Sequence, residues 1–257
     1  VYRIPGAGGA ATVLFDPSAT AEKPKYLWGL AVGRDGAVYV AAGAPAAVYR
    51  VPAGGGKADV LFKTADQHIR CLLMAPDGTL WAGSDGSGVI YKISTTQAGA
   101  KPFAVYAAAR RETTSVAMDA AGNVYAAGVG TARTTLPPLP VTGTTGIPIT
   151  FSQPGSASAM GTNALVPDGS EIYRIAPDGT PMKLLALKDD VVYALAVHNG
   201  SLLAATGNRG RVYRVDTDGD GRFTDVAHLD ASEGMAFAPE KDGLLVATSN
   251  SGKVFTL

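Results

Sequence analysis

The sequence has few charged residues, few aromatic residues and one cysteine. Charged side chains make up 17% of the 257 residues, against roughly 25% in an average domain, and 22 acidic residues balance 22 basic ones. Zero net charge argues against a nucleic-acid partner, which needs a basic face. The lone Cys71 excludes an internal disulfide and a cysteine-based zinc site, and its apolar neighbours predict a buried strand. No stretch reaches the roughly 18 apolar residues of a membrane-spanning helix.

Glycine and apolar residues are plentiful, and they recur with a fixed period. A glycine followed by an apolar strand occurs at Gly36, Gly78, Gly122, Gly200 and Gly243. A second motif, apolar-Tyr-basic-apolar in most copies, occurs at 1–4, 48–51, 90–93, 172–175, 212–215 and 254–257. Further apolar stretches precede each glycine and follow most Tyr-Arg motifs. Four short strands in each repeat of about 42 residues predict an all-β fold, a β-propeller of four-stranded antiparallel blades.

The strand count predicts four full blades and two partial ones within a single domain, 1–257. With strands A to D numbered outward from the centre, the full blades fall at 27–62, 69–106, 114–187 and 192–229. Residues 234–257 supply A, B and C, and residues 1–15 supply C and D. A five-bladed ring closes if Ala11–Phe15 serves as the missing D strand. We favour a cut from a six- or seven-bladed ring, because Val1 is the first residue of a repeat motif.

The sequence of strand C predicts which of its side chains are buried. Successive side chains of a strand point to opposite faces. We therefore expect each tyrosine of the Tyr-Arg motif to be buried between blades and the following Arg or Lys to be exposed.

The third blade is interrupted between strands B and C by residues 131–170. This segment contains eight threonines and six prolines, and only Arg133 and Asp168 are charged. Such a composition is typical of a flexible loop. Its apolar residues and the extended Pro137–Pro140 stretch equally suit an arm docked on the ring or on another subunit.

These blades, with their Asp-Gly turn, Val-Tyr-Ala strand and Val-Tyr-Arg-Val strand, resemble bacterial β-propeller repeat proteins that are usually exported. The resemblance is nearer to NHL and two-component-regulator propellers than to WD-repeat proteins, whose Trp-Asp dipeptide is absent. It implies a periplasmic, cell-surface or secreted location and covers nearly all of the chain outside 131–170. It leaves the function open, because enzymes, receptors and scaffolds share the fold.

The residues just before strand A are expected to rim the central channel. With the repeats aligned by their glycine, they are Trp28, Arg70, Thr114, Tyr193 and Gly234. With the nearby His68, the candidate ligand-binding residues are Trp28, Arg70, Tyr193 and His68. Arg70 would hold an anionic or sugar-like ligand between aromatic surfaces. The alternative is a solvated rim without a ligand.

No catalytic residues are predicted, since no Gly-x-Ser-x-Gly, phosphate-binding or His-Glu-x-x-His motif occurs. The sequence favours a non-catalytic binding or scaffold propeller that presents its loops and the 131–170 arm to a protein or surface partner, or assembles with other subunits. A small-molecule ligand is a further option. The alternative is a lactonase- or lyase-like enzyme with its site at the channel mouth.

One loop predicts a structural calcium ion. Asp216, Asp218 and Asp220 occupy positions 1, 3 and 5 of a loop with glycine at position 6, which resembles the calcium loop of EF-hands. Arg222 would add its carbonyl at position 7. Position 12 is Ala227 rather than the usual glutamate, so Asp225 would close a shorter loop. The alternative is an acidic hairpin turn without an ion.

Overall fold

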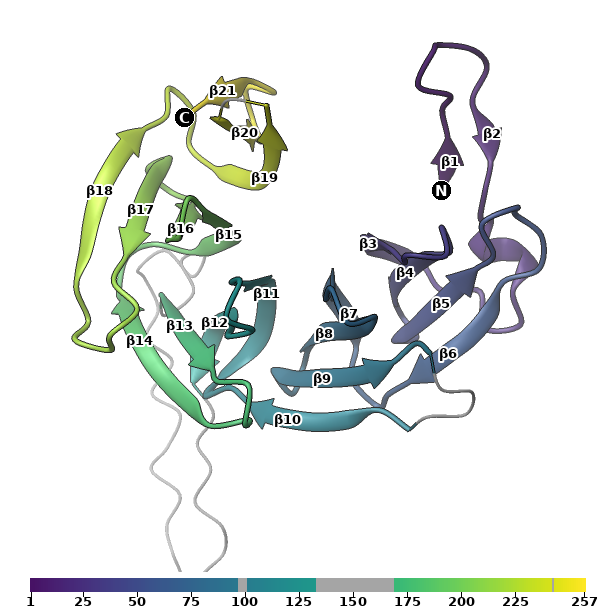
Figure 1. Cartoon of the computed structure of the whole chain (residues 1–257), viewed down its shortest axis with the longest axis horizontal. Coiled ribbons are helices and arrows are strands. Elements are labelled where there is room, and N and C mark those ends of the chain that lie inside the picture. The colour runs from purple at the N-terminus through teal and green to yellow at the C-terminus, as the bar shows by residue number, and fades with distance from the viewer. Residues whose placement is uncertain (97–100, 133–168, 242) are drawn as a thin grey trace, which may run out of the picture.

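The computed structural model describes residues 1–96, 101–132, 169–241 and 243–257. In this part of the chain there are 21 strands and one short 3-10 helix, Pro17–Ala19. None of the helical structure described is long and apolar enough to cross a bilayer. The sheets follow one another around an arc, and the two termini face each other across its open side (Figure 1).

Four complete blades form where the repeats predict them. The first consists of β3 (Tyr26–Val32), β4 (Val38–Gly43), β5 (Ala47–Val51) and β6 (Asp59–Lys63). The second consists of β7 (His68–Met74), β8 (Thr79–Asp85), β9 (Val89–Ser94) and β10 (Phe103–Ala107). Each strand pairs antiparallel with the next.

The third and fourth blades repeat this order. The third consists of β11 (Arg110–Met118), β12 (Val124–Ala132), β13 (Ser170–Ile175) and β14 (Pro181–Leu187). The fourth consists of β15 (Val192–His198), β16 (Ser201–Thr206), β17 (Arg211–Val215) and β18 (Phe223–His228). The all-β propeller fold is therefore confirmed.

The repeat glycines make the A–B turns possible. Gly36 and Gly78 have φ angles of 76° and 84°, in the left-handed region where glycine has no steric penalty. In each turn the preceding aspartate accepts a backbone hydrogen bond, from Ala37 N–H at 3.1 Å in one and from Thr79 N–H at 2.8 Å in the other. This Asp-Gly chemistry fixes the register in which strands A and B pair.

The two partial blades contain the predicted strands but do not join. The C-terminal sheet is β19 (Gly234–Glu240), β20 (Gly243–Thr248) and β21 (Val254–Thr256), and the N-terminal hairpin is β1 (Tyr2–Arg3) with β2 (Thr12–Val13). The five-bladed closure is wrong for this structure: Thr12 pairs with Arg3, not with β21. The hairpin instead reproduces the outer half of a blade, with Tyr2 opposite Val13 as Tyr49 is opposite Val60.

The blades pack through small and apolar residues. Ala41, Ala82, Ala126 and Ala204 of the second strands are fully or almost fully buried, which lets neighbouring sheets approach closely. A core cluster from Ala117 to Val215 joins the third blade to the fourth. Cys71 is buried, as predicted, and burial raises the pKa of its thiol to about 12.

The prediction for strand C holds in three of the full blades. Tyr49, Tyr173 and Tyr213 are at most 4% exposed. Tyr91 is only half-buried, and its hydroxyl is hydrogen-bonded to Thr64 and Asp66. Of the following basic residues, Lys92 and Arg214 are exposed, as predicted, whereas Arg50 and Arg174 are half-buried.

Candidate functional site

Each of the five inner strands β3, β7, β11, β15 and β19 has a β-bulge at the same place. The register shifts by one residue between 27/29, 69/71, 113/115, 192/194 and 234/236. A bulge leaves one residue unpaired and re-aims its side chain. The five residues that are turned out in this way are Trp28, Arg70, Thr114, Tyr193 and Met235. Each inner strand thus has one unpaired residue near its start, at an equivalent position around the arc.

Four of these five are the predicted channel-mouth residues. The fifth is Met235, so the expectation of Gly234 is wrong by one position. Gly243 and Met235 are eight residues apart, the same spacing as Gly36 and Trp28, so the expected Gly234 lay one residue too far back. Met235 is 40% exposed, as is Trp28.

Glycines at the end of strand B make room for the aromatic side chains. A methyl group on Gly43 would lie 1.9 Å from Nδ1 of His68 and 2.8 Å from Nε1 of Trp28, and one on Gly207 would lie 2.4 Å from the Tyr193 ring. Only glycine fits in either place. Sequence reasoning missed this link, although the signal, a glycine closing the small-residue strand B, is present in both repeats.

Arg70 is the centre of the cluster at the mouth. Its guanidinium carbon lies 3.8 Å from the centroid of the Trp28 ring, and its Nε donates a 2.5 Å hydrogen bond to Oε1 of Glu112. The three residues come from β3, β7 and β11, so this chain of contacts ties three blades together. The Glu112 carboxylate balances the charge of Arg70, so Arg70 is not an unpaired cation available to an anionic ligand.

His68 completes the aromatic side of the cluster. Its ring packs edge-on against Trp28 and Tyr26, at centroid distances of 5.4 Å and 5.5 Å, while Tyr26 and Trp28 stack on each other. Its Nδ1 is buried without a hydrogen-bond partner. The structure therefore brings together the predicted Trp28, Arg70 and His68, and adds Tyr26 and Glu112.

Tyr193, in the fourth blade, lies near the charged side chains of Arg70 and Glu112. Burial raises the pKa of its phenol, and the carboxylates of Glu233 and Glu112 raise it further, while Arg70 lowers it. Glu233 in turn accepts a hydrogen bond from the Ser249 hydroxyl. The mouth thus offers aromatic surface and paired charges, which suit stacking and hydrogen bonding to a partner.

The three histidines do not form a metal site. His198 ends β15 at an A–B turn and His228 ends β18. Within the described ranges, no group of three or more His, Cys, Asp or Glu side chains is placed to hold a metal ion.

The acidic loop is organised around Arg222. Its guanidinium nitrogens lie 3.2 Å, 2.7 Å and 3.3 Å from carboxylate oxygens of Asp216, Asp218 and Asp220. The Arg222 carbonyl accepts a 3.1 Å hydrogen bond from Asp216 N–H, and Asp225 pairs with Arg211 across β17 and β18. A calcium ion at the three aspartates would have to displace the Arg222 side chain, and calcium binding stays a prediction.

The insertion 131–170 lies outside the described residues apart from its two ends. Those ends belong to β12 and β13, where Val129 pairs with Ser170. The bulge at Thr114 lies next to Gly128 of β12. The described ends of the insertion, Ala132 and Ser170, therefore lie on the face that carries the channel mouth.

Comparison of the sequence with family models and with curated proteins gives no match. The fold is similar to a chain in the crystal structure of a nidogen/laminin complex, with a TM-score of 0.65, 13% identity, and coverage of 96% of this chain and 79% of that chain. The fold is similar to virginiamycin B lyase from Staphylococcus aureus, with a TM-score of 0.58, 14% identity, and coverage of 90% of this chain and 69% of that chain. It is also similar to a PQQ-bound aldose sugar dehydrogenase from Streptomyces coelicolor, with a TM-score of 0.62, 18% identity, and coverage of 98% of this chain and 82% of that chain.

These similarities define the chain as a β-propeller repeat protein. At 12–18% identity they show the fold alone. The neighbours include enzymes as well as extracellular and protein-complex domains, so the function has to be argued from the mouth itself.

Proposed function

We propose that this propeller is a non-catalytic binding module that recognises a protein partner at its channel mouth, outside the cytoplasm. The observation that carries the proposal is the stack of Trp28, Arg70 and Glu112. Arg70 is held on the exposed Trp28 ring and paired with Glu112 before any partner arrives. Trp, Tyr and Arg are the side chains that dominate binding energy at protein interfaces, and preorganised ones lose little entropy on binding.

The same contacts argue against the lyase- or lactonase-like alternative. A general acid or base has to be free to exchange a proton with substrate. Glu112 is committed to Arg70, and Glu233 accepts from Ser249. The His68 ring packs against two aromatic rings.

Affinity capture from an extract of the source organism tests the proposal, with three immobilised proteins: the wild type, Trp28→Ala and Arg214→Ala. Arg214 is an exposed strand-C residue outside the mouth and serves as the matched control. We expect a protein that the wild type and Arg214→Ala retain and that Trp28→Ala loses by about tenfold or more, as for a hot-spot tryptophan. Equal capture by Trp28→Ala contradicts the proposal. Turnover of a sugar lactone or cyclic depsipeptide that is lost in Glu112→Gln establishes the enzyme instead.

A further inference from the structure

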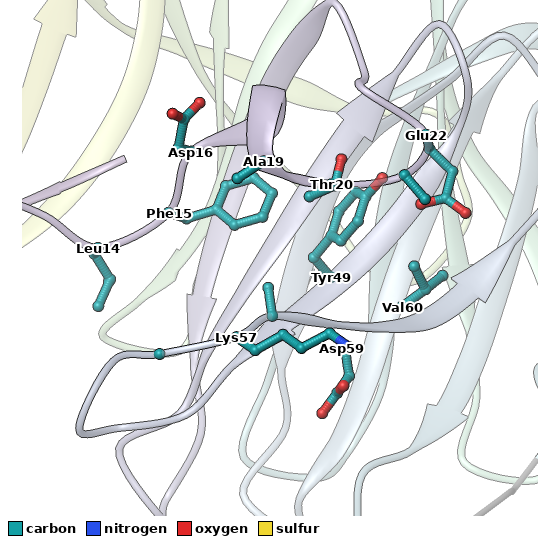
Figure 2. A pocket seen from close by; sticks show the side chains of 13 residues that line it. Leu14, Phe15, Asp16, Ala19, Thr20, Glu22, Tyr49, Lys57, Asp59 and Val60 are labelled. Atoms are coloured by element: carbon teal, nitrogen blue, oxygen red, sulfur yellow. The ribbon is translucent and has the colours of Figure 1, made fainter.

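The pocket against the outer strands of the first blade, about 410 Å³ in volume, does not bring its charged groups together (Figure 2). The carboxylates of Asp16 and Asp59 lie on opposite sides of it. Asp16 already accepts hydrogen bonds from Ser18, and the carboxylate of Glu22 is bound to Lys63. Two of its three carboxylates are therefore already bound, and the third lies apart from Asp16.

A second cavity, of about 470 Å³, lies between the fourth blade and the C-terminal sheet. The fourth blade contributes residues from all four of its strands, and β20 contributes Gly243 and Leu244. His198, the last residue of β15, lines this cavity, whereas Tyr193 of the mouth lies near the start of the same strand. The cavity is therefore at the A–B turn end of the blades, opposite the mouth.

Arg214, which lines this cavity, is the basic residue of strand C in the fourth blade. Its counterparts in the first and third blades have polar partners. Arg50 forms a 2.6 Å ion pair with Asp35, which precedes the glycine of its own A–B turn. Arg174 donates a 2.7 Å hydrogen bond to the carbonyl of Thr217 in the next blade.

Arg214 has no such partner. It forms neither an ion pair nor a hydrogen bond with any residue in the described part of the chain. Where the first blade has Asp35 before its turn glycine, the fourth blade has the neutral Asn199. Among the described residues that line the cavity, none has an acidic side chain. The guanidinium of Arg214 therefore gives the cavity an uncompensated positive charge, which favours an anionic ligand.

Two further donors border the same cavity. Asn199 Nδ2 lies 3.0 Å from His198 Nε2, and because an amide nitrogen donates, the neutral imidazole has its own proton on Nδ1. Ser201 pairs with His198 across the β15–β16 hairpin, and Leu203 pairs with Arg214 across β16 and β17. Ser201 and Leu203 are two residues apart in one strand and so lie on one face of the sheet. The hydroxyl, the imidazole and the guanidinium are therefore neighbours.

We propose that this cavity binds a small carboxylate with an apolar tail. The carboxylate accepts hydrogen bonds from the guanidinium of Arg214 and the hydroxyl of Ser201, and the tail lies on Leu203, Val226 and Leu244, which also line the cavity. The planar guanidinium fork matches a carboxylate, and one guanidinium balances one negative charge, whereas a phosphate dianion would keep a surplus. The volume is in the range of small-molecule sites, roughly 300–1,000 Å³.

Calorimetric titration with three probes tests the ligand class. The probes are hexanoate, 1-hexanol, which lacks the charge, and inorganic phosphate, which lacks the tail. Because Arg214 is exposed to solvent, we expect hexanoate to bind in the millimolar range. We expect each of the other two probes to bind about tenfold more weakly, or less tightly still. Absence of hexanoate binding at about 20 mM overturns the proposal, and so does equally tight binding of 1-hexanol or phosphate.

Two substitutions test the role of the unpaired charge. Arg214→Gln removes the charge, and Asn199→Asp restores the turn carboxylate that pairs with Arg50 in the first blade. Asn199 has a φ of 49°, which aspartate also tolerates, so the turn should be kept and the melting temperature should stay unchanged. Each substitution should weaken hexanoate binding by about tenfold or more.

Arg50→Gln is the matched control, because Arg50 is already paired with Asp35 and lies outside the cavity. It should leave hexanoate binding unchanged. Binding that is as tight in Arg214→Gln or in Asn199→Asp as in the wild type overturns the proposal, and so does an equal loss of binding in Arg50→Gln.

Discussion

The hydroxyl of Tyr213 donates a 2.7 Å hydrogen bond to the carboxylate of Asp190 and so ties strand C of the fourth blade to the loop that enters that blade. Both residues are 4% exposed. The hydrogen bond from Tyr91 to Asp66 makes the same connection in the second blade. In these two blades the repeated tyrosine therefore anchors the connection between blades.

This anchor predicts a loss of stability at alkaline pH. Burial, together with the hydrogen bond to the Asp190 carboxylate, raises the pKa of Tyr213 to about 12. In the unfolded chain the pKa is about 10. The stabilisation is therefore complete below pH 10 and is lost as the pH rises through 12. Urea unfolding at pH 8, 10 and 11 should show a smaller fall in Tyr213→Phe than in the wild type. Parallel falls would show that Tyr213 does not contribute.

Gly43→Ala should disrupt the aromatic side of the mouth. The added methyl group would lie 1.9 Å from Nδ1 of His68, so the His68 and Trp28 rings must move. We expect a loss of about 1–3 kcal/mol in the free energy of unfolding and a change in Trp28 fluorescence, best read in a Trp81→Phe background. Gly54→Ala is the control, because no atom lies within 4 Å of its added methyl group. Equal effects of the two substitutions would contradict the packing described.

Tyr173→Ala and Arg214→Ala test the alternation of strand C. Tyr173 is 2% exposed, and removing such an aromatic side chain from a core costs about 3–5 kcal/mol. Arg214 is exposed, and its removal should change the free energy of unfolding by less than about 0.5 kcal/mol. Denaturant unfolding measures both. Small losses in both variants would mean that the strand faces are assigned incorrectly.

The prediction of calcium can be tested through Arg222. Replacing it with alanine keeps the backbone carbonyl but removes the guanidinium that pairs with Asp216, Asp218 and Asp220. We expect calcium to bind the wild type weakly and Arg222→Ala more tightly, because the ion no longer competes with the side chain. Calorimetric titration measures both affinities. Absence of binding to either protein at millimolar calcium, or binding that persists in Asp218→Ala/Asp220→Ala, rules the site out.

The inserted segment is predicted to mediate association. Replacing residues 133–168 by a short Gly-Ser linker should leave the propeller folded, because the paired residues of β12 and β13 are all retained, from the Val124–Ile175 pair to the Val129–Ser170 pair. We expect the shortened protein to no longer bind its partner or associate with other subunits. Light scattering after gel filtration should then give the molar mass of a single chain. Rapid proteolytic cutting of this segment in the intact assembly would instead favour the flexible loop.

The sequence determined the fold of this protein because local chemistry repeats in it. Each Asp-Gly turn sets one hairpin, and each Tyr-Arg strand alternates between a buried and an exposed face. Both signals act over a few residues, so the boundaries of four blades and the order of their strands followed directly. The same local signals placed Trp28, Arg70 and Tyr193 at equivalent strand ends.

What the side chains do at those ends was decided only by the tertiary structure. Arg70 finds Trp28 and Glu112 on the two neighbouring blades, and no spacing within the chain indicates that its charge is already balanced. The Arg222 side chain pairs with the aspartates of the loop that the sequence predicts to bind calcium. The Tyr49 hydroxyl has no carboxylate partner, unlike those of Tyr91 and Tyr213, and the carboxylate of Glu22 is bound to Lys63. The Arg70–Glu112 pair joins residues 42 apart in the sequence, and the Arg222 pairs depend on how one side chain folds over its own loop. A periodic pattern records neither.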